Sequence, residues 1–336
     1  MTMLLPKFEL YQPTTVEDVV SIVKEHGAEN IDFLAGGSDL LCNYKWGLNA
    51  KPHVIALSRV SALNNLEAGK IGACATLSEI ASSEVIAKNF PVLAYVAKKV
   101  ASVLIQEQAT IGGNVLLDNR CHFFNQSYFW RRSLGYCLKA DGDRCHVIPK
   151  IKRDGQLVEN SYECFATNSS DFAPVLITLG AEFEFAGSEG TRTIAAKDFY
   201  AHDGRDRFVK KGDEFLVSIS LPESAKNYKA GYKKLRPRES WDFPVLGIAA
   251  TIQFDDSDKL THFSLAVNAV DTHPIVFDDY VADWIGKPLD DEAINKIAEH
   301  VKASVQPKLT VPMEPGYRKK MAAVFTRRLL TELVNS

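Results

Sequence analysis

The spacing of apolar residues predicts a mixed first half of the chain, in which short helices alternate with short strands. Residues 14–27 (TTVEDVVSIVKEHG) carry valines at helical spacing behind Thr15, whose side chain is suited to cap a helix. Gly27 stands where this helix would end, because glycine accepts the left-handed conformation common at helix ends. Further strands are predicted over residues 31–35, 54–58 and 70–75, and further helices over residues 77–83 and 91–104.

The pattern changes twice, and the changes predict the domain organisation. Residues 105–120 read as a polar loop, and the aromatic, basic stretch at about 119–165 lacks a clear period, so we expect an insertion there. Regular elements then return and end before Pro222, which predicts a first domain over residues 1–222. Three strand-like segments and two helical stretches predict a small α+β domain with an antiparallel sheet over residues 223–336.

Composition narrows the class of protein but says little about its chemistry. Hydrophobic residues make up 46% of the chain, charged residues 24%, and the net charge is -3, so no overall affinity for nucleic acid or membranes is expected. No segment approaches the roughly 20 apolar residues needed to span a bilayer, which predicts a cytoplasmic protein. Charge is uneven, because residues 119–153 hold eight Lys or Arg against two Asp, a net +6.

The chain has six cysteines, and in a reducing compartment they indicate buried thiols, metal ligands or redox chemistry rather than disulfides. Cys42 and Cys74 lie in apolar surroundings and are predicted to be buried core residues. The other four lie in or next to the insertion without a C-x-x-C pair, so spacing alone indicates neither a zinc ribbon nor a ferredoxin-type run. An aromatic core with incidental cysteines is the alternative. These four are Cys121, Cys137, Cys145 and Cys164.

Two glycine pairs share one sequence pattern, in which an apolar segment precedes Gly-Gly and a polar residue follows it. They lie in FLAGGSDLL (33–41) and ATIGGNV (109–115). Glycine permits positive φ and close backbone approach, so peptide N–H groups could surround a phosphate. Each pair could equally make a simple tight turn. The absence of GxGxxG and GxxxxGK[ST] disfavours a Rossmann site and a P-loop.

Both glycine segments resemble those of the flavoprotein subunits of molybdenum hydroxylases, the family of xanthine dehydrogenase and CO dehydrogenase. The resemblance implies a non-Rossmann FAD-binding fold of two α+β subdomains, similar to that of vanillyl-alcohol oxidase, followed by a CO-dehydrogenase-type C-terminal domain. It implies that FAD is bound by Ala35, Gly36, Gly37, Ser38, Asp39, Leu40, Thr110, Ile111, Gly112, Gly113 and Asn114.

Three further positions match the family pattern. The resemblance implies that Asp171 accepts hydrogen bonds from ribose hydroxyls, although Ser170 or Asp171 would also serve as a helix cap. Leu216 and Lys234 fall where family members contact the isoalloxazine ring. A cation at the flavin would stabilise its reduced, anionic form. Lys234 could instead be a solvated strand residue.

The stretch 118–150 (DNRCHFFNQSYFWRRSLGYCLKADGDRCHVIPK) is similar to a loop of the 4-hydroxybenzoyl-CoA reductase branch of this family. The similarity implies a [4Fe–4S] cluster with Cys121, Cys137, Cys145 and Cys164 as its ligands. The gap between Cys145 and Cys164 is longer than in that branch and carries the extra stretch IKRDGQLVENSYE.

The resemblance implies an electron-transfer subunit without catalytic side chains of its own, whose redox chemistry resides in its cofactors. Its implied partners are a molybdopterin-binding large subunit, a small [2Fe–2S] subunit and a ferredoxin-type carrier. Two alternatives stay open: a flavin subunit that passes electrons to NAD, and a non-catalytic scaffold stabilised by zinc.

Overall fold

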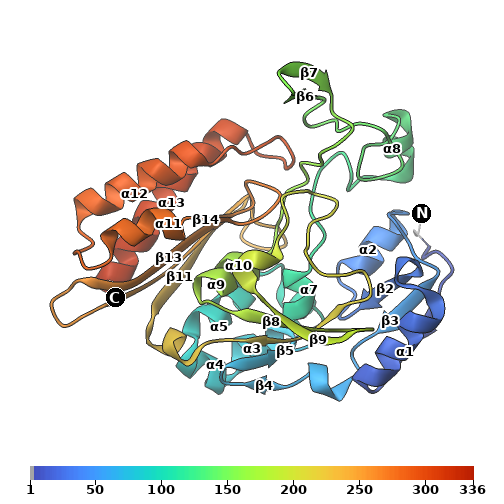
Figure 1. The fold of residues 1–336 in the computed structure, drawn as a ribbon, viewed down its shortest axis with the longest axis horizontal. Helices are drawn as coiled ribbons and strands as arrows, with labels where there is room; N and C mark the ends of the chain where they lie inside the picture. The colour runs from blue at the N-terminus through green and yellow to red at the C-terminus, as the bar shows by residue number, and fades with distance from the viewer. Residues whose placement is uncertain (1–3) are drawn as a thin grey trace.

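The computed structural model describes residues 4–336, and it is a mixed α+β structure with a projecting irregular segment (Figure 1). The chain begins with a parallel three-stranded sheet in the order β1-β3-β2, next to helix α1. Thr15 Oγ1 accepts a hydrogen bond from Asp18 N at 3.1 Å and so caps α1, as predicted. This part comprises β1 (Glu9–Tyr11), α1 (Val16–His26), β2 (Ile31–Leu34), α2 (Leu40–Lys45) and β3 (His53–Ala56).

A second, antiparallel sheet of five strands has the order β4-β5-β10-β8-β9. Its central strand, β10, pairs with β5 on one side and β8 on the other, so the sheet joins chain segments from before and after the insertion. The strands are β4 (Leu66–Glu67), β5 (Lys70–Gly72), β8 (Glu182–Gly187), β9 (Gly190–Ala195) and β10 (Phe215–Ser220). The helices are α3 (Leu77–Ser82), α4 (Glu84–Asn89), α5 (Pro91–Lys99), α6 (Val103–Gln106), α7 (Ile111–Val115), α9 (Phe172–Thr178) and α10 (Ala196–Phe199).

The helix predicted over residues 91–104 is two helices, α5 and α6, because the backbone turns between them. Ala101 has a φ of 44°, which ends the helical run. Its carbonyl oxygen accepts a hydrogen bond from Trp241 N at 2.9 Å, a partner remote in sequence. The polar loop predicted over 105–120 is also wrong in part, since it contains α7. Short-range periodicity could not reveal either feature.

The insertion projects from the body of the molecule (Figure 1) and has little regular structure. It contains only helix α8 (Tyr128–Ser133) and the hairpin β6 (Lys150–Arg153) to β7 (Gln156–Glu159). Arg131 fastens it to the first subdomain, because its guanidinium donates to the carbonyl oxygens of Trp46 and Gly47, both at 3.1 Å. Side chain to backbone hydrogen bonds therefore replace a continuous sheet or helix here.

The C-terminal part is an antiparallel sheet, β11-β12-β13-β14, with helices over one face. Alternate residues of β12 enter different cores: Ile248 packs towards these helices, whereas Ala249 packs into the core of the first half. The strands are β11 (Lys229–Leu235), β12 (Leu246–Phe254), β13 (Leu260–Asn268) and β14 (Ile275–Val276), and the helices are α11 (Asp278–Val281), α12 (Asp291–Ser304) and α13 (Pro315–Asn335). Within residues 4–336 there are also four 3-10 turns, Ala28–Asn30, Ser61–Leu63, Glu223–Asn227 and Ala282–Trp284.

Among residues 4–336, no helix has both the length and the apolar character that crossing a membrane requires.

Candidate functional site

A cavity of about 1220 Å³ is lined by both glycine segments, by strand β10 and by the loop between β11 and β12. Pockets for drug-sized ligands measure about 300–1,000 Å³, so a cavity of this size suits a dinucleotide. Its walls come from the two sheets of the first half and from the C-terminal part. The cavity thus lies where these units meet.

The two glycine pairs meet at one wall of this cavity. A Cβ atom built on Gly36 would lie 1.6 Å from the backbone oxygen of Gln108, so only glycine permits this approach. Gly37 has a φ of +73°, as a left-handed turn requires. The second pair differs from the expectation, because Gly112 and Gly113 form the first turn of α7, where Thr110 Oγ1 accepts from Gly113 N at 3.0 Å.

Most of the predicted FAD-binding residues line this cavity, although their roles stay predictions. Ile111 does not line it, since its side chain is fully buried in the core. Lys234 is also not among the lining residues. Those that do line it are Ala35, Gly36, Gly37, Ser38, Asp39, Leu40, Thr110, Gly112, Gly113, Asn114, Asp171 and Leu216.

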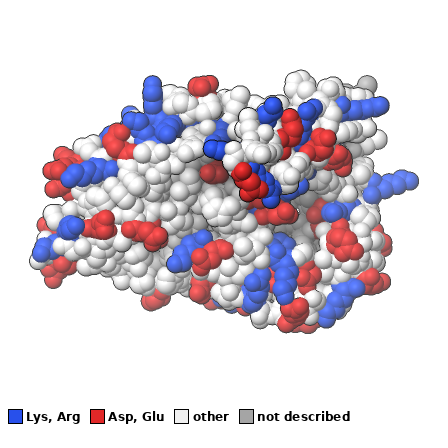
Figure 2. All heavy atoms as spheres, turned by 45° about the horizontal axis from the view of Figure 1, so that its top comes forward, with Lys and Arg blue, Asp and Glu red and all other residues white. Residues whose placement is uncertain are grey.

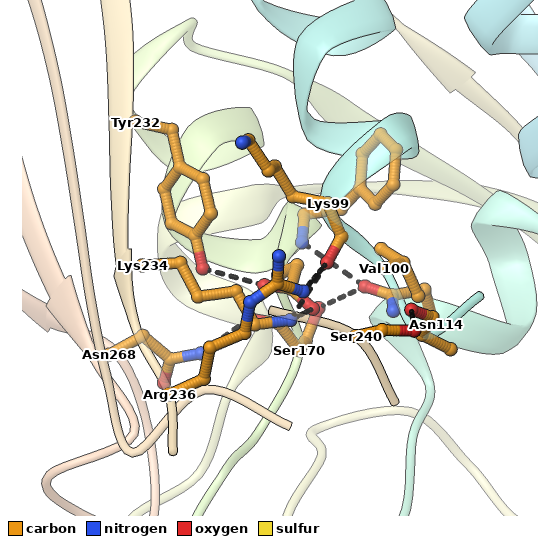
Figure 3. Close-up of polar contacts among 12 residues, drawn as sticks. Lys99, Val100, Asn114, Ser170, Tyr232, Lys234, Arg236, Ser240 and Asn268 are labelled. Atoms are coloured by element: carbon orange, nitrogen blue, oxygen red, sulfur yellow. Dashed lines mark hydrogen bonds and ion pairs between the residues drawn. The ribbon is translucent and has the colours of Figure 1, made fainter. Parts of the chain in front are cut away.

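Asp171 belongs to a buried polar network with Tyr232 and Lys234, and Figure 3 shows these two side chains beside Lys99. One carboxylate oxygen accepts from Tyr232 Oη at 2.8 Å and the other from Lys234 Nζ at 2.9 Å. Lys234 also donates to the carbonyl oxygen of Lys99 at 3.1 Å, which ties β11 to the end of α5. Burial raises the pKa of Asp171 and lowers that of Lys234, and their contact opposes both shifts.

The structure decides two alternatives that the sequence left open: Ser170 does cap the helix, as one of the two residues proposed for that role, and Lys234 is not solvated. The side chain of Asp171 makes no capping hydrogen bond to α9; instead Ser170 Oγ accepts from Ala173 N at 3.0 Å. The side chain of Lys234 is 3% exposed, so it is not a solvated strand residue. The side-chain oxygen of Asn114 also has its hydrogen-bond donors within the protein: Oδ1 accepts from Ser170 Oγ at 2.8 Å and from Phe172 N at 3.1 Å.

Several charged residues of the cavity were missed by the sequence analysis. Arg120 forms an ion pair with Asp39 of the first glycine segment, and its guanidinium lies 4.5 Å from the ring centre of Phe243. Burial lowers the pKa of Arg120 to about 10. Burial also lowers the pKa of Lys210, another lining residue, to about 8. Nothing in the local pattern links these cations to the glycine pairs.

The two cysteines outside the insertion both line this cavity. Cys74 is buried, as predicted, whereas Cys42 is exposed. The prediction for Cys42 is wrong because α2 buries Asn43 and Tyr44 and leaves Cys42 on its exposed side.

The four remaining cysteines surround a second, small cavity together with aromatic and aliphatic side chains. Each of the four is buried, and none forms a disulfide. Burial raises the pKa of Cys121 to about 12 and that of Cys164 to about 11, so these two thiols are protonated at neutral pH. A bound cation would favour the thiolates.

The long segment between Cys145 and Cys164 contains the β6–β7 hairpin, which brings its two ends together. Asn160 N donates to the carbonyl oxygen of Pro149 at 2.9 Å, and Cys145 N donates to that of Asn160, also at 2.9 Å. The buried side chain of Asn160 donates to Ile148 O and Glu163 O and accepts from Glu163 N. The extra residues therefore project outward, and both cysteines reach the same cavity.

One observation favours a metal centre at these four cysteines, and another does not. Their chemistry suits iron–sulfur ligation, since they are buried thiols from four separate chain positions. In the part of the chain that the structure describes, however, no group of three or more His, Cys, Asp or Glu side chains is arranged so that it could hold a metal ion. The cluster is therefore not confirmed, and the arrangement offers no support for zinc either.

Charge on the insertion is largely internal. Of the eight cations counted in residues 119–153, Arg131 and Lys139 are buried and the side chain of Arg120 is 15% exposed. Three further acids, Asp154, Glu159 and Glu163, are exposed just beyond that window. Figure 2 shows basic and acidic side chains intermixed over the visible face. The local excess of positive charge is thus not a basic surface.

Comparison with known proteins agrees with this architecture. The family of FAD-binding domains in molybdopterin dehydrogenases matches residues 6–224, and the CO dehydrogenase flavoprotein C-terminal domain matches residues 230–333. The aldehyde oxidoreductase FAD-binding subunit of Escherichia coli is 30% identical over 256 residues, 74% of this chain and 77% of that protein. The carbon monoxide dehydrogenase medium chain of Hydrogenophaga pseudoflava is 23% identical and covers 98% of this chain and 97% of its own.

Solved structures share the fold. CO dehydrogenase from Oligotropha carboxidovorans superimposes with a TM-score of 0.79 at 22% identity, covering 99% of both chains. Quinoline 2-oxidoreductase from Pseudomonas putida 86 gives a TM-score of 0.73 at 19% identity, again with 99% coverage of both. The predicted α+β, non-Rossmann fold is confirmed. The closeness to the 4-hydroxybenzoyl-CoA reductase branch stays a prediction.

Proposed function

The chain belongs to the family of molybdopterin dehydrogenase FAD-binding subunits, and on that basis we propose that it carries electrons through one FAD and one [4Fe–4S] cluster within a heteromeric molybdenum enzyme. In this proposal FAD lies in the large cavity and the cluster is bound by Cys121, Cys137, Cys145 and Cys164. The relatives are named as FAD-binding subunits or medium chains, which supports action within a complex.

One observation carries the two-cofactor proposal: the cysteine cavity and the large cavity share a wall. Cys121, Phe124 and Lys139 line both. Electron transfer between two centres requires that they lie close together, and one layer of side chains separates these sites. FAD supplies the ability to exchange electrons in pairs with one partner and singly with iron–sulfur centres.

The residues of this chain bind and shield the cofactors. Gly36 and Gly37 bring backbone N–H groups to the FAD pyrophosphate, where side chains would block the approach. Asp171 and Lys234 hold β11 against the end of α5 and would so keep the neighbouring part of the FAD cavity rigid. Phe124, which is 1% exposed, excludes water between the two sites.

The more specific proposal concerns direction and partners. We assign the chain a role like that of the 4-hydroxybenzoyl-CoA reductase flavin subunit, relaying electrons between a ferredoxin-type carrier and partner subunits that hold [2Fe–2S] centres and molybdopterin. The resemblance of residues 118–150 to that branch and the burial of the four cysteines support it.

Metal and flavin analysis of anaerobically purified protein tests the cofactor content. We expect about four irons and one FAD per chain, as a Cys₄ ligand set for this cluster implies. Cys121→Ser should lose the cluster absorbance and keep FAD. Cys42→Ser, a control at a cysteine outside the four proposed ligands, should keep the cluster absorbance. Zinc in place of iron, or four irons retained by Cys121→Ser, would overturn the assignment.

Anaerobic titration tests the direction. Reduced ferredoxin should bleach the flavin of the wild-type protein within the complex, and NADH should not. Rapid reduction by NADH with none by ferredoxin would instead establish the alternative, a flavin subunit that passes electrons to NAD.

A further inference from the structure

Lys139 occupies an unusual position, in the wall between the cysteine cavity and the large cavity. It lines both, and only 8% of the residue is exposed. Its Nζ lies 5.1 Å from the ring centre of Phe124, which lines both cavities too. A lysine is almost never buried unless it is paired. Its partners therefore matter.

Lys139 is held by one carboxylate and one carbonyl oxygen. Its Nζ donates to Asp118 Oδ1 at 2.8 Å and to the carbonyl oxygen of Gly204 at 2.6 Å. The same Asp118 oxygen is 3.2 Å from Nη1 of Arg207, a residue of the large cavity. Two cations thus share one anion.

Gly204 links this lysine to a cysteine. Gly204 N donates to the carbonyl oxygen of Cys164 at 2.8 Å, and a Cβ atom on Gly204 would lie 2.9 Å from Cys164 Sγ. Lys139 itself follows Cys137 by two residues. Its ammonium group is therefore fixed between two of the four cysteines on one side and the large cavity on the other.

Building on the proposed function, we propose that Lys139 is a positioning residue whose fixed charge raises the reduction potentials of both the cluster and the flavin. A reduced centre carries more negative charge than its oxidised form, so a buried cation stabilises the reduced form. Solvent and salt screen a buried charge much less than an exposed one. One side chain would thus tune both centres together, and Asp118 would oppose it.

The test compares four variants by reduction potential. Lys139→Met keeps the length of the side chain without its charge, Lys139→Arg keeps the charge, and Asp118→Asn removes the opposing charge. Lys150→Met removes an exposed lysine of the same insertion that lines neither cavity. Potentials are measured by electron paramagnetic resonance for the cluster and by visible spectra for the flavin.

We expect Lys139→Met to lower the reduction equilibrium constant of both centres about tenfold, or 59 mV for a one-electron couple. A neighbouring charge shifts an ionisation equilibrium by about one to three powers of ten, and the low end suits a charge beyond contact distance. Asp118→Asn should raise both potentials, Lys139→Arg should stay near the wild type, and Lys150→Met should change little.

Opposite shifts in Lys139→Met and Asp118→Asn are the decisive result, because a purely structural role would move both variants in the same direction. If Lys139→Met does not retain iron, Asp118→Asn and Lys139→Arg still decide the sign. If the protein holds four irons, unchanged reduction potentials, or shifts of the same sign in Lys139→Met and Asp118→Asn, would overturn this inference and leave the proposed function intact. Wild-type protein with FAD but no iron would overturn the proposed function, and this inference with it.

Discussion

The large cavity and the cysteine cavity are adjacent, yet they are built in different ways. The large cavity is formed where sheets and helices meet, and at Gly36 and Gln108 two of its backbone segments approach so closely that no side chain fits between them. The cysteine cavity lies in a stretch with only one short helix and one hairpin, held by the buried side chains of Arg131, Lys139 and Asn160. The first site depends on backbone shape, and the second depends on a few polar side chains.

This difference indicates which kind of substitution should disrupt each site. A site shaped by backbone packing is lost when an added atom prevents two segments from meeting. A site held by buried polar side chains is lost when one hydrogen-bonding group is removed, because its partners are then left unsatisfied. Substitutions in the two regions should therefore separate FAD content from iron content.

The largest effect is expected for Gly36→Ala. The new Cβ would lie 1.6 Å from Gln108 O, and neither backbone can yield without moving a glycine segment. We expect FAD affinity to fall by at least about two powers of ten, since displacement of a positioned ligand group by about 1 Å has effects of that size. Flavin fluorescence titration measures it.

The matched control is Gly316→Ala, where an added Cβ meets nothing within 4 Å. It should bind FAD like the wild type. Equal FAD affinity in Gly36→Ala would show that the two glycine segments do not form the pyrophosphate site.

Lys234→Met should have the largest effect on stability, whereas Gly36→Ala acts on FAD binding. It leaves Asp171 buried without its cation, and breaking a buried pair by removal of one partner costs about 3–5 kcal/mol. The double variant Lys234→Met with Asp171→Asn should recover part of this, because no unpaired charge remains. Denaturant unfolding gives both values. A double variant no more stable than Lys234→Met alone would contradict the importance of the pair.

Asn160→Ala should have a smaller effect on stability, confined to the insertion. The amide makes hydrogen bonds to Ile148 O, Glu163 O and Glu163 N, and loss of a buried partner costs about 1–3 kcal/mol. We expect reduced iron content with unchanged FAD. Asn295→Ala, which removes an exposed asparagine of α12, serves as control. Loss of FAD together with iron would show that the two regions are not independent.

The sequence predicted the elements that carry a strong period, such as α1 with its Thr15 cap and the strands around β12. The structure brings the two glycine pairs to one cavity wall, and their role in FAD binding stays a prediction. The sequence could not predict the break at Ala101, the pairing of Arg120 with Asp39 or the position of Lys139, because each depends on partners remote along the chain. The charge count over residues 119–153 does not describe the surface for the same reason, since burial removes several cations from it.

The burial of these cations leads to the smallest expected effect, which concerns the rate at which an electron carrier reduces the protein. Within residues 119–165 the exposed cations Arg132, Arg144, Lys150, Lys152 and Arg153 are matched in number by the exposed acids Asp141, Asp143, Asp154, Glu159 and Glu163. Electrostatic steering needs an excess of one sign, so the rate of reduction by an acidic ferredoxin should change less than about threefold between low and high salt. Stopped-flow reduction at two salt concentrations measures this rate.

The double variant Glu159→Lys with Glu163→Lys raises the charge by four and should make the rate salt-dependent. A steep salt dependence in the wild type would instead indicate that the carrier docks elsewhere, on a surface with a true charge excess.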